Sequence, residues 1–123
     1  MSDHVLVVDD DPSITAAVRD GLEFEGYRVT TAGNGAEALR EVRDDPPTLI
    51  LLDMRMPVMS GWEFAREYRM VGHQAPVIVM TAAANAGTWA AEIEADAVLP
   101  KPFTLDDLFD AVGRWRLLPD EPA

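Results

Sequence analysis

The chain has 123 residues, of which 48% are hydrophobic and 26% are charged, a composition typical of one folded domain and not of a disordered segment. A net charge of -12 repels nucleic acid and anionic membranes over most of the surface, so we expect neither as a direct ligand. The absence of cysteine excludes disulfides and thiolate metal sites.

The first residues, MSDH, are acidic and precede only a short apolar run, which is unlike a secretory signal peptide. No later apolar run in the sequence approaches the length of a membrane span. We therefore expect a cytoplasmic protein without a membrane partner.

Five short aliphatic runs predict β-strands. They are HVLVV at 4–8, YRVTT at 27–31, TLILL at 48–52, PVIVM at 76–80 and a weaker AVL at 97–99. Apart from the second, these runs are continuous rather than alternating, which is typical of parallel strands that are covered on both faces.

Most segments between the strands carry helix start signals. Asp11 before Pro12 predicts an N-cap and a first helical residue. An apolar stripe follows at four-residue spacing, and Gly26 is expected to end this helix. The stripe consists of Ile14, Val18 and Leu22. Three further segments begin with the spacing of a capping box: Asn34 with Glu37, Ser60 with Glu63, and Thr104 with Asp107. The segment NAGTWAAEIEAD at 85–96 has few apolar anchors, so we expect it to be the most mobile helix.

This alternation predicts an α/β fold: a (βα)5 doubly wound, five-stranded parallel sheet with strand order 2-1-3-4-5 and helices on both faces. We expect residues 1–118 to form this domain. Residues 119–123 are expected to be a tail or the start of a linker.

Acidic residues follow two of the predicted strands, at the edge where open parallel sheets bind ligands. Asp9 and Asp10 follow the first strand and Asp53 follows the third, which are neighbours in the predicted order. Three carboxylates this close must share a cation, or one of them takes up a proton. Mg²⁺ accepts a few carboxylates together with waters and phosphate oxygens, so we expect Mg²⁺ here, with Mn²⁺ as a substitute.

Asp53 ends the central strand, where packing can direct one carboxylate oxygen toward an electrophile while a metal binds the other. Such a carboxylate can attack a phosphoryl group and form an aspartyl phosphate. Thr81 and Lys101, after the fourth and fifth strands, are placed to neutralise the charge of the transferred group. Ala83 and Arg55 offer no base for rapid hydrolysis, so we expect the phosphoryl group to persist.

Several motifs extend over essentially the whole chain: VVDDD at 7–11, ILLD at 50–53, MPVMSGWE at 56–63, TA at 81–82 and KPF at 101–103. In these motifs and their spacing the chain resembles the receiver domain of a two-component response regulator, which has a flavodoxin-like fold. The resemblance implies that Asp53 accepts a phosphoryl group from a histidine kinase or a phosphotransfer protein. It further implies a signalling switch, not an enzyme, whose phosphorylation changes the affinity for a downstream effector protein or output domain.

The resemblance also implies roles for individual residues. Asp9, Asp10, Asp53 and the backbone carbonyl of Arg55 organise Mg²⁺ in this reading. Thr81 and Lys101 respond to the phosphoryl group, and the Lys101–Pro102 bond is expected to be cis. The positions expected to modulate the switch are Ala82, Ala83, Val98 and Pro102.

One position departs from the family pattern. Many receivers carry Tyr or Phe three residues before the lysine, and the ring turns inward when the threonine moves toward the phosphate. This chain has Val98 there, a side chain with a single restricted torsion and little area. The usual aromatic readout of the switch is therefore in doubt.

Two other functions share parts of the pattern. A small-molecule phosphatase or phosphotransferase of the haloacid-dehalogenase type uses an aspartyl nucleophile but needs an acid two residues later, where this chain has Arg55. A flavin-binding module of the same fold needs a Ser, Thr and Gly phosphate loop after the first strand. This chain has acids there, which repel phosphate in the absence of a metal.

Overall fold

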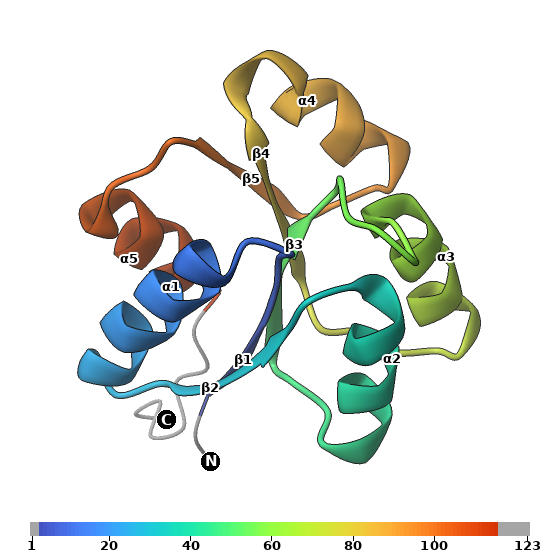
Figure 1. Cartoon of the computed structure of the whole chain (residues 1–123), viewed down its shortest axis with the longest axis horizontal. Coiled ribbons are helices and arrows are strands. Elements are labelled where there is room, and N and C mark those ends of the chain that lie inside the picture. The colour runs from blue at the N-terminus through green and yellow to red at the C-terminus, as the bar shows by residue number, and fades with distance from the viewer. Residues whose placement is uncertain (1–2, 116–123) are drawn as a thin grey trace, which may run out of the picture.

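The computed structural model describes residues 3–115, in which strands and helices alternate along the chain (Figure 1). The strands are β1 (His4–Val8), β2 (Arg28–Ala32), β3 (Leu49–Asp53), β4 (Val77–Ala82) and β5 (Ala97–Lys101). The helices are α1 (Pro12–Phe24), α2 (Gly35–Asp44), α3 (Gly61–Met70), α4 (Ala83–Glu92) and α5 (Leu105–Gly113). The predicted alternation is confirmed, although most strands end slightly later than expected.

The strands form one parallel sheet in the order β2-β1-β3-β4-β5, as predicted. Helices α1 and α5 cover one face, and α2, α3 and α4 cover the other (Figure 1). β1 lies between β2 and β3, so the direction of winding reverses at this strand and leaves a crevice at its carboxyl end. The carboxyl ends of β1 and β3 are therefore neighbours.

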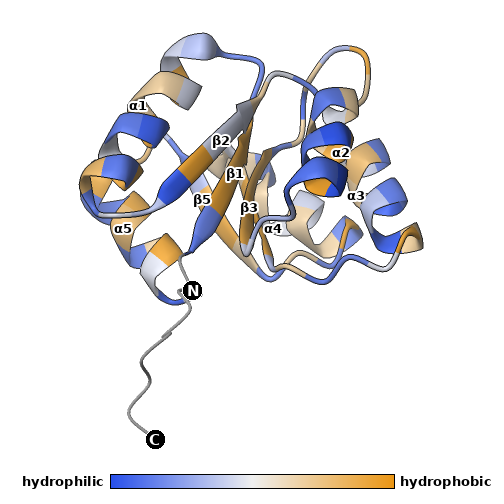
Figure 2. Cartoon of the chain, turned by 90° about the horizontal axis from the view of Figure 1, so that it is seen from below, coloured by the Kyte–Doolittle hydropathy of each residue, from blue (hydrophilic) through white to orange (hydrophobic). Residues whose placement is uncertain are grey.

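The centre of the sheet supplies most of the core. Every residue of β1 and β3 is buried, whereas the edge strands β2 and β5 are partly exposed. This difference explains why the central runs in the sequence are continuous and the edge runs are weaker. Figure 2 shows the hydrophobic residues gathered along the strands and at intervals on the helices. Within residues 3–115, no helix has the length and apolar character needed to span a membrane.

The capping residues act largely as the sequence predicts. The Asp11 side chain accepts a hydrogen bond from the Ser13 backbone N–H at 2.9 Å, with Pro12 as the first helical residue of α1. Full capping boxes open α3, at Ser60, and α5, at Thr104. At α2, Asn34 accepts from the Glu37 backbone as expected, but the Glu37 side chain accepts from the Gly33 backbone at 3.2 Å.

The helix predicted at 85–96 lies earlier in the chain than expected. α4 begins at Ala83, directly after β4, and its N-cap residue Ala82 makes no side-chain capping hydrogen bond. Without a polar cap, the sequence carries no local signal for this start. The helix ends before Glu94, whose φ of 54° is incompatible with its continuation. The predicted domain boundary at residue 118 and the tail at 119–123 lie outside the described residues.

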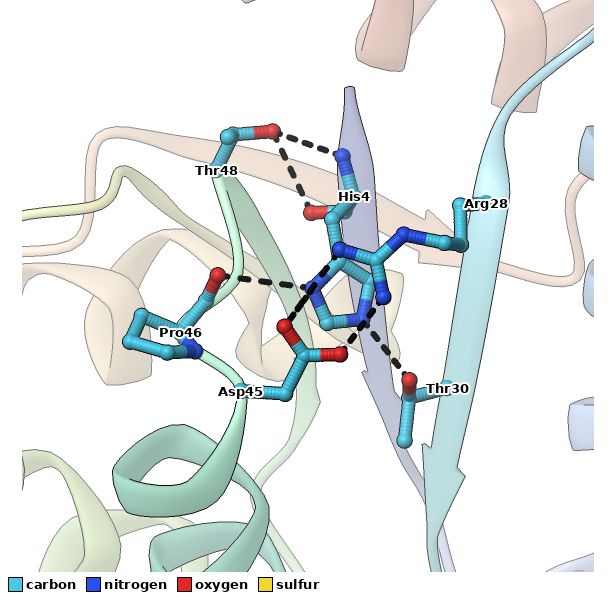
Figure 3. A network of polar contacts seen from close by, with 6 residues as sticks. All are labelled: His4, Arg28, Thr30, Asp45, Pro46 and Thr48. Carbon is cyan, nitrogen blue, oxygen red and sulfur yellow. Dashed lines mark hydrogen bonds and ion pairs between the residues drawn. The ribbon is translucent and has the colours of Figure 1, made fainter. Parts of the chain in front are cut away.

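A polar cluster lies at the amino end of the sheet, around His4 (Figure 3). The His4 ring is buried, and its Nε2 lies 2.7 Å from the Thr30 hydroxyl. Its Nδ1 lies 3.4 Å from the Pro46 carbonyl oxygen, which can only accept a hydrogen bond, so Nδ1 carries the proton. Asp45 forms a double contact with the Arg28 guanidinium at the rim of this cluster.

Candidate functional site

The three predicted acids meet at the carboxyl end of β1 and β3. The two strands pair with Val8 opposite Leu52, so the next residues, Asp9 and Asp53, lie at the same level at the carboxyl edge of the sheet. One carboxylate oxygen from each of Asp9, Asp10 and Asp53 lies within 4.8 Å of the others. Asp9 and Asp53 are buried, whereas Asp10 is exposed at the mouth of the cluster.

Lys101 joins this cluster from the end of β5. Its Nζ atom lies 2.7 Å from Asp9 Oδ2 and 3.8 Å from Asp53 Oδ1. The Lys101–Pro102 peptide bond is cis, which confirms the expectation from the sequence. The other oxygen of Asp9 accepts the Asp11 backbone N–H at 3.0 Å, so both oxygens of Asp9 have partners. Asp9 is therefore held firmly between the α1 turn and the lysine.

The environment of the cluster alters the ionisation of Asp53 and of Lys101. Burial, followed by the charge of Asp9, raises the pKa of Asp53 from 3.8 to about 6, although Lys101 acts in the opposite direction. Burial disfavours the Lys101 ammonium, but the hydrogen bond to Asp9 and the charges of both acids outweigh it and raise the pKa of Lys101. One lysine thus only partly compensates the three carboxylates.

A tight loop after β3 holds Asp53 in place. A Cβ atom added at Gly61 would lie 2.7 Å from Met54 Cα and 2.9 Å from the Asp53 carbonyl oxygen, both of them backbone atoms. Only glycine allows the start of α3 to approach the end of β3 this closely. In the same loop Val58 has a φ of 70°, a conformation that β-branched residues rarely adopt.

The other predicted residues lie on the neighbouring strands. Thr81 is buried near the end of β4, next to Met80, which pairs with Asp53 across the sheet. Ala82 pairs with Lys101 at the β4–β5 ladder. All four positions predicted to modulate the switch are exposed at this end of the sheet or on its edge strand: Ala82, Ala83, Val98 and Pro102. Val98 pairs with Val79 on the edge strand β5 and belongs to neither buried cluster.

Sequence reasoning missed one group of contacts beside the acids. The Arg55 guanidinium lies over the Trp89 ring, with 5.5 Å between Cζ and the ring centroid. Trp89 in turn contacts the edge of Trp62, and Trp62 Nε1 donates to Glu92 at 2.7 Å. The aromatic and charged residues were visible in the sequence, but nothing in their spacing indicated that α3, α4 and this loop converge.

The cluster suits a hard divalent cation. Three carboxylates offer oxygen ligands within a small volume, and burial together with the charge of Asp9 raises the pKa of Asp53, a penalty on the charged form that a cation relieves. The donor set contains only oxygen, and the exposed position of Asp10 leaves one side open to solvent and to an incoming ligand. The residues therefore fit a magnesium-like ion.

Residues 5–113 match the model of one protein family, the response regulator receiver domain. The chain belongs to this family. It is 40% identical over 120 residues to the response regulator MprA of Mycobacterium ulcerans, an alignment that covers 96% of this chain and 50% of that protein. It is also 37% identical over 124 residues to MprA of Mycobacterium leprae, covering 98% of this chain and 54% of that protein.

Solved structures agree on the fold of this receiver domain. The chemotaxis response regulator CheY4 of Vibrio cholerae superposes with a TM-score of 0.86 at 32% identity, covering 94% of this chain and 99% of that chain. A CheY-like receiver domain protein of Methanospirillum hungatei gives a TM-score of 0.83 at 28% identity, with 93% of each chain covered. The chain spans about half the length of the curated relatives it matches, and nearly the full length of these solved chains.

Proposed function

We propose that this receiver domain is a switch that accepts a phosphoryl group on Asp53 from the phosphohistidine of a histidine kinase or phosphotransfer protein. The observation that supports it best is the placement of a buried carboxylate, Asp53, 3.8 Å from the Lys101 ammonium and beside Asp9 and Asp10. An oxygen of Asp53 attacks the phosphorus, a P–O bond forms and the P–N bond breaks. The released imidazole takes its proton from solvent.

The proposal assigns the acid cluster to a divalent cation, Mg²⁺ or in its place Mn²⁺. Asp9, Asp10 and Asp53 would hold the ion with carboxylate oxygens, and Arg55 with its backbone carbonyl. When bound, the ion neutralises charge on the phosphoryl oxygens. Lys101 would contribute a second positive charge beside Asp53, and the Thr81 hydroxyl is proposed to reach a phosphoryl oxygen as a hydrogen-bond donor.

We expect the phosphorylated state to persist long enough to signal. Positions 83 and 55 offer no base to activate a water, because Ala83 is inert and Arg55 is cationic. The domain in this proposal promotes only its own phosphorylation and slow dephosphorylation, and it turns over no other substrate. Ala82 and Pro102, beside Thr81 and Lys101 in the chain, are proposed to shape this response.

The proposed output is a change in affinity for a downstream effector protein or an output domain. Phosphorylation shifts a two-state equilibrium in which Thr81 and α4 move. Because Val98 offers no aromatic ring, this readout must use other contacts. The proposal includes a cytoplasmic location.

Intact mass after incubation with acetyl phosphate and Mg²⁺ tests this function. The wild type should gain one phosphoryl group that is stable in acid and labile in base, and Asp53→Asn should gain none. Asp11→Asn is the matched control, because it changes an acid of the same run that caps α1 and lies outside the three-carboxylate cluster. Steady turnover of acetyl phosphate without a lasting mass gain contradicts the proposal and favours a phosphatase.

A further inference from the structure

Four side chains connect the loop after Asp53 to α3 and α4. Arg55 comes from the loop, Trp62 from the first turn of α3, and Trp89 and Glu92 from α4. The Arg55 guanidinium lies 5.5 Å from the Trp89 centroid, and the two tryptophan rings meet edge to face at 5.0 Å. Trp62 Nε1 donates to Glu92 Oε1 at 2.7 Å and closes the group. We call these four residues the arginine–tryptophan bridge.

The bridge matters most to α4, because this helix buries few side chains of its own. Only Ala86 and Ala90 of α4 are buried, both of them small, and no side chain caps its N-terminus. Gly87 adds further freedom near its middle. Trp89 is the one large apolar side chain in Ala83–Glu92, so its contacts with Arg55 and Trp62 hold the body of the helix, while Arg69 of α3 donates to the Ile93 carbonyl at its end.

Arg55 lies two residues after the phosphoacceptor and also contacts α4. Burial is the main cause that raises the pKa of Asp53, and the backbone N–H of Arg55 acts in the opposite direction, while the Arg55 side chain lies over Trp89. The side chain is exposed, so no packing prevents it from turning toward the acid cluster. A single residue is thus in contact with the site of modification and with the helix that must respond.

The balance between these two contacts depends on the charge at Asp53. A phosphoryl group adds nearly two negative charges and three strong acceptor oxygens. Charge-assisted hydrogen bonds from a guanidinium to phosphate oxygens are stronger than an exposed cation–π contact. A phosphoryl group on Asp53 therefore competes with the Trp89 ring for the Arg55 side chain, and the phosphoryl group is the stronger partner.

We propose that Arg55 and Trp89 are positioning residues that hold α4 in the unmodified protein and separate when Asp53 carries a phosphoryl group. Arg55 then turns toward the phosphoryl oxygens, Trp89 loses its cation, and α4 keeps the Trp62 contacts and the Arg69 hydrogen bond at its end. This route bypasses position 98, where the chain has no aromatic ring. The inference rests on the proposed function of Asp53.

Tryptophan fluorescence can follow the bridge directly. The chain has three tryptophans, and Trp115→Phe leaves only the two in the bridge. In this background the sample is phosphorylated with acetyl phosphate and Mg²⁺, and emission, acrylamide quenching and intact mass are recorded together. Phosphorylation should change the emission intensity and increase quenching, because Trp89 loses the guanidinium that covers one face. Mg²⁺ alone should change neither, since a cation at the backbone carbonyl of Arg55 does not attract the positively charged guanidinium away from Trp89.

Variants separate the bridge from a general structural effect. Arg55→Ala should abolish the fluorescence response per phosphorylated molecule, and Arg55→Lys should retain it because the cation is kept. Glu92→Gln should also retain it, since the amide oxygen can still accept from Trp62 Nε1. These outcomes together support the bridge as the link between Asp53 and α4.

Four results would overturn the inference. A phosphoryl mass gain without a fluorescence response overturns the bridge alone and leaves the function of Asp53 intact. An equal response in Arg55→Ala, or an equal response to Mg²⁺ alone, does the same. Absence of any mass gain on the wild type overturns the proposed function, and the inference falls with it.

Discussion

The two ends of the same sheet each hold a cluster of polar side chains that includes buried groups, but the two clusters are balanced differently. At the amino end, both ring nitrogens of His4 face oxygen partners, and the nearby Asp45 is paired with Arg28 (Figure 3). At the carboxyl end, three carboxylates share one ammonium, and the pKa of Asp53 is raised to about 6.

This difference distinguishes a structural cluster from a functional one. The amino-end groups satisfy one another, so their hydrogen bonds contribute to stability and leave nothing for a ligand. At the carboxyl end, burial and then the neighbouring acids disfavour the Asp53 carboxylate, so a part of the folding free energy is given up for the proposed cation site. Substitutions that remove a polar or charged group should therefore lower the stability at the amino end and raise it at the carboxyl end.

The largest expected effect is at the amino end. His4→Ala removes a ring that is 2% exposed and leaves the Pro46 carbonyl and the Thr30 hydroxyl without their partner. We expect a loss of about 3 kcal/mol in the free energy of unfolding, from the cavity and the unpaired polar groups together. Urea unfolding measures it.

A graded control belongs to the same experiment. Thr30→Val removes only the hydroxyl partner of His4 Nε2 and should cost about 1 kcal/mol. If His4→Ala costs no more than Thr30→Val, the ring is not a structural centre of the amino end. The polar cluster around His4 then contributes little to stability.

The sequence predicted the carboxyl-end cluster much better than the amino-end one, for a physical reason. Acids directly after continuous aliphatic runs must lie at the ligand-binding edge of a parallel sheet, so strand order alone brings Asp9 and Asp53 together. The partners of His4 come from β2 and from the loop before β3, and their meeting depends on register and side-chain rotamers. No periodicity in the sequence encodes those details.

The same limit applies to α4 and to the loop after β3. No capping residue marks the start of α4 at Ala83, directly after β4, so local sequence signals could not predict where this helix begins. The contact between Arg55 and Trp89 joins residues far apart in the sequence through side chains whose directions depend on tertiary packing. Local signals predicted the elements, whereas long-range contacts between exposed or half-buried side chains required the structure.

The second effect, at the carboxyl end, should have the opposite sign. Burial and then the charge of Asp9 raise the pKa of Asp53 from 3.8 to about 6, so the folded state binds more protons than the unfolded state between these values. Without Mg²⁺, the stability of the wild type therefore falls as the pH rises through this window. Asp53→Asn removes the charge and should be more stable by about 1 to 2 kcal/mol at about pH 7.5.

The full shift corresponds to about 3 kcal/mol, but Lys101 loses an attractive partner in the variant, which reduces the gain. Urea unfolding at about pH 4 and about pH 7.5, without divalent ions, measures the difference. The two proteins should be similar at the lower pH and diverge at the higher one. An Asn variant that is less stable at the higher pH shows that the acids are not in conflict.

A cation should reverse the penalty at the carboxyl end. At a concentration about ten times its dissociation constant, Mg²⁺ should stabilise the wild type by about 1.4 kcal/mol, because it binds the folded state alone. Asp53→Asn and Asp10→Asn should lose most of this stabilisation, whereas His4→Ala should keep it. Thermal unfolding at constant ionic strength tests this, since the net charge of -12 makes any salt stabilising. Equal stabilisation of all four proteins indicates screening instead of a site.

The smallest expected effect concerns backbone strain beside the acids. Val58 has a φ of 70° and is 81% exposed, so its side chain gains little from packing while its β-branch opposes the conformation. Val58→Asn should increase the free energy of unfolding by about 1 kcal/mol, because Asn tolerates the left-handed region. The matched control is Val71→Asn, at an exposed valine whose φ is -90°. A gain in the free energy of unfolding at Val58 with none at Val71 locates backbone strain in the loop that holds Asp53. Equal changes at the two positions show that this loop is not strained, and the instability beside Asp53 is then assigned to the carboxylates.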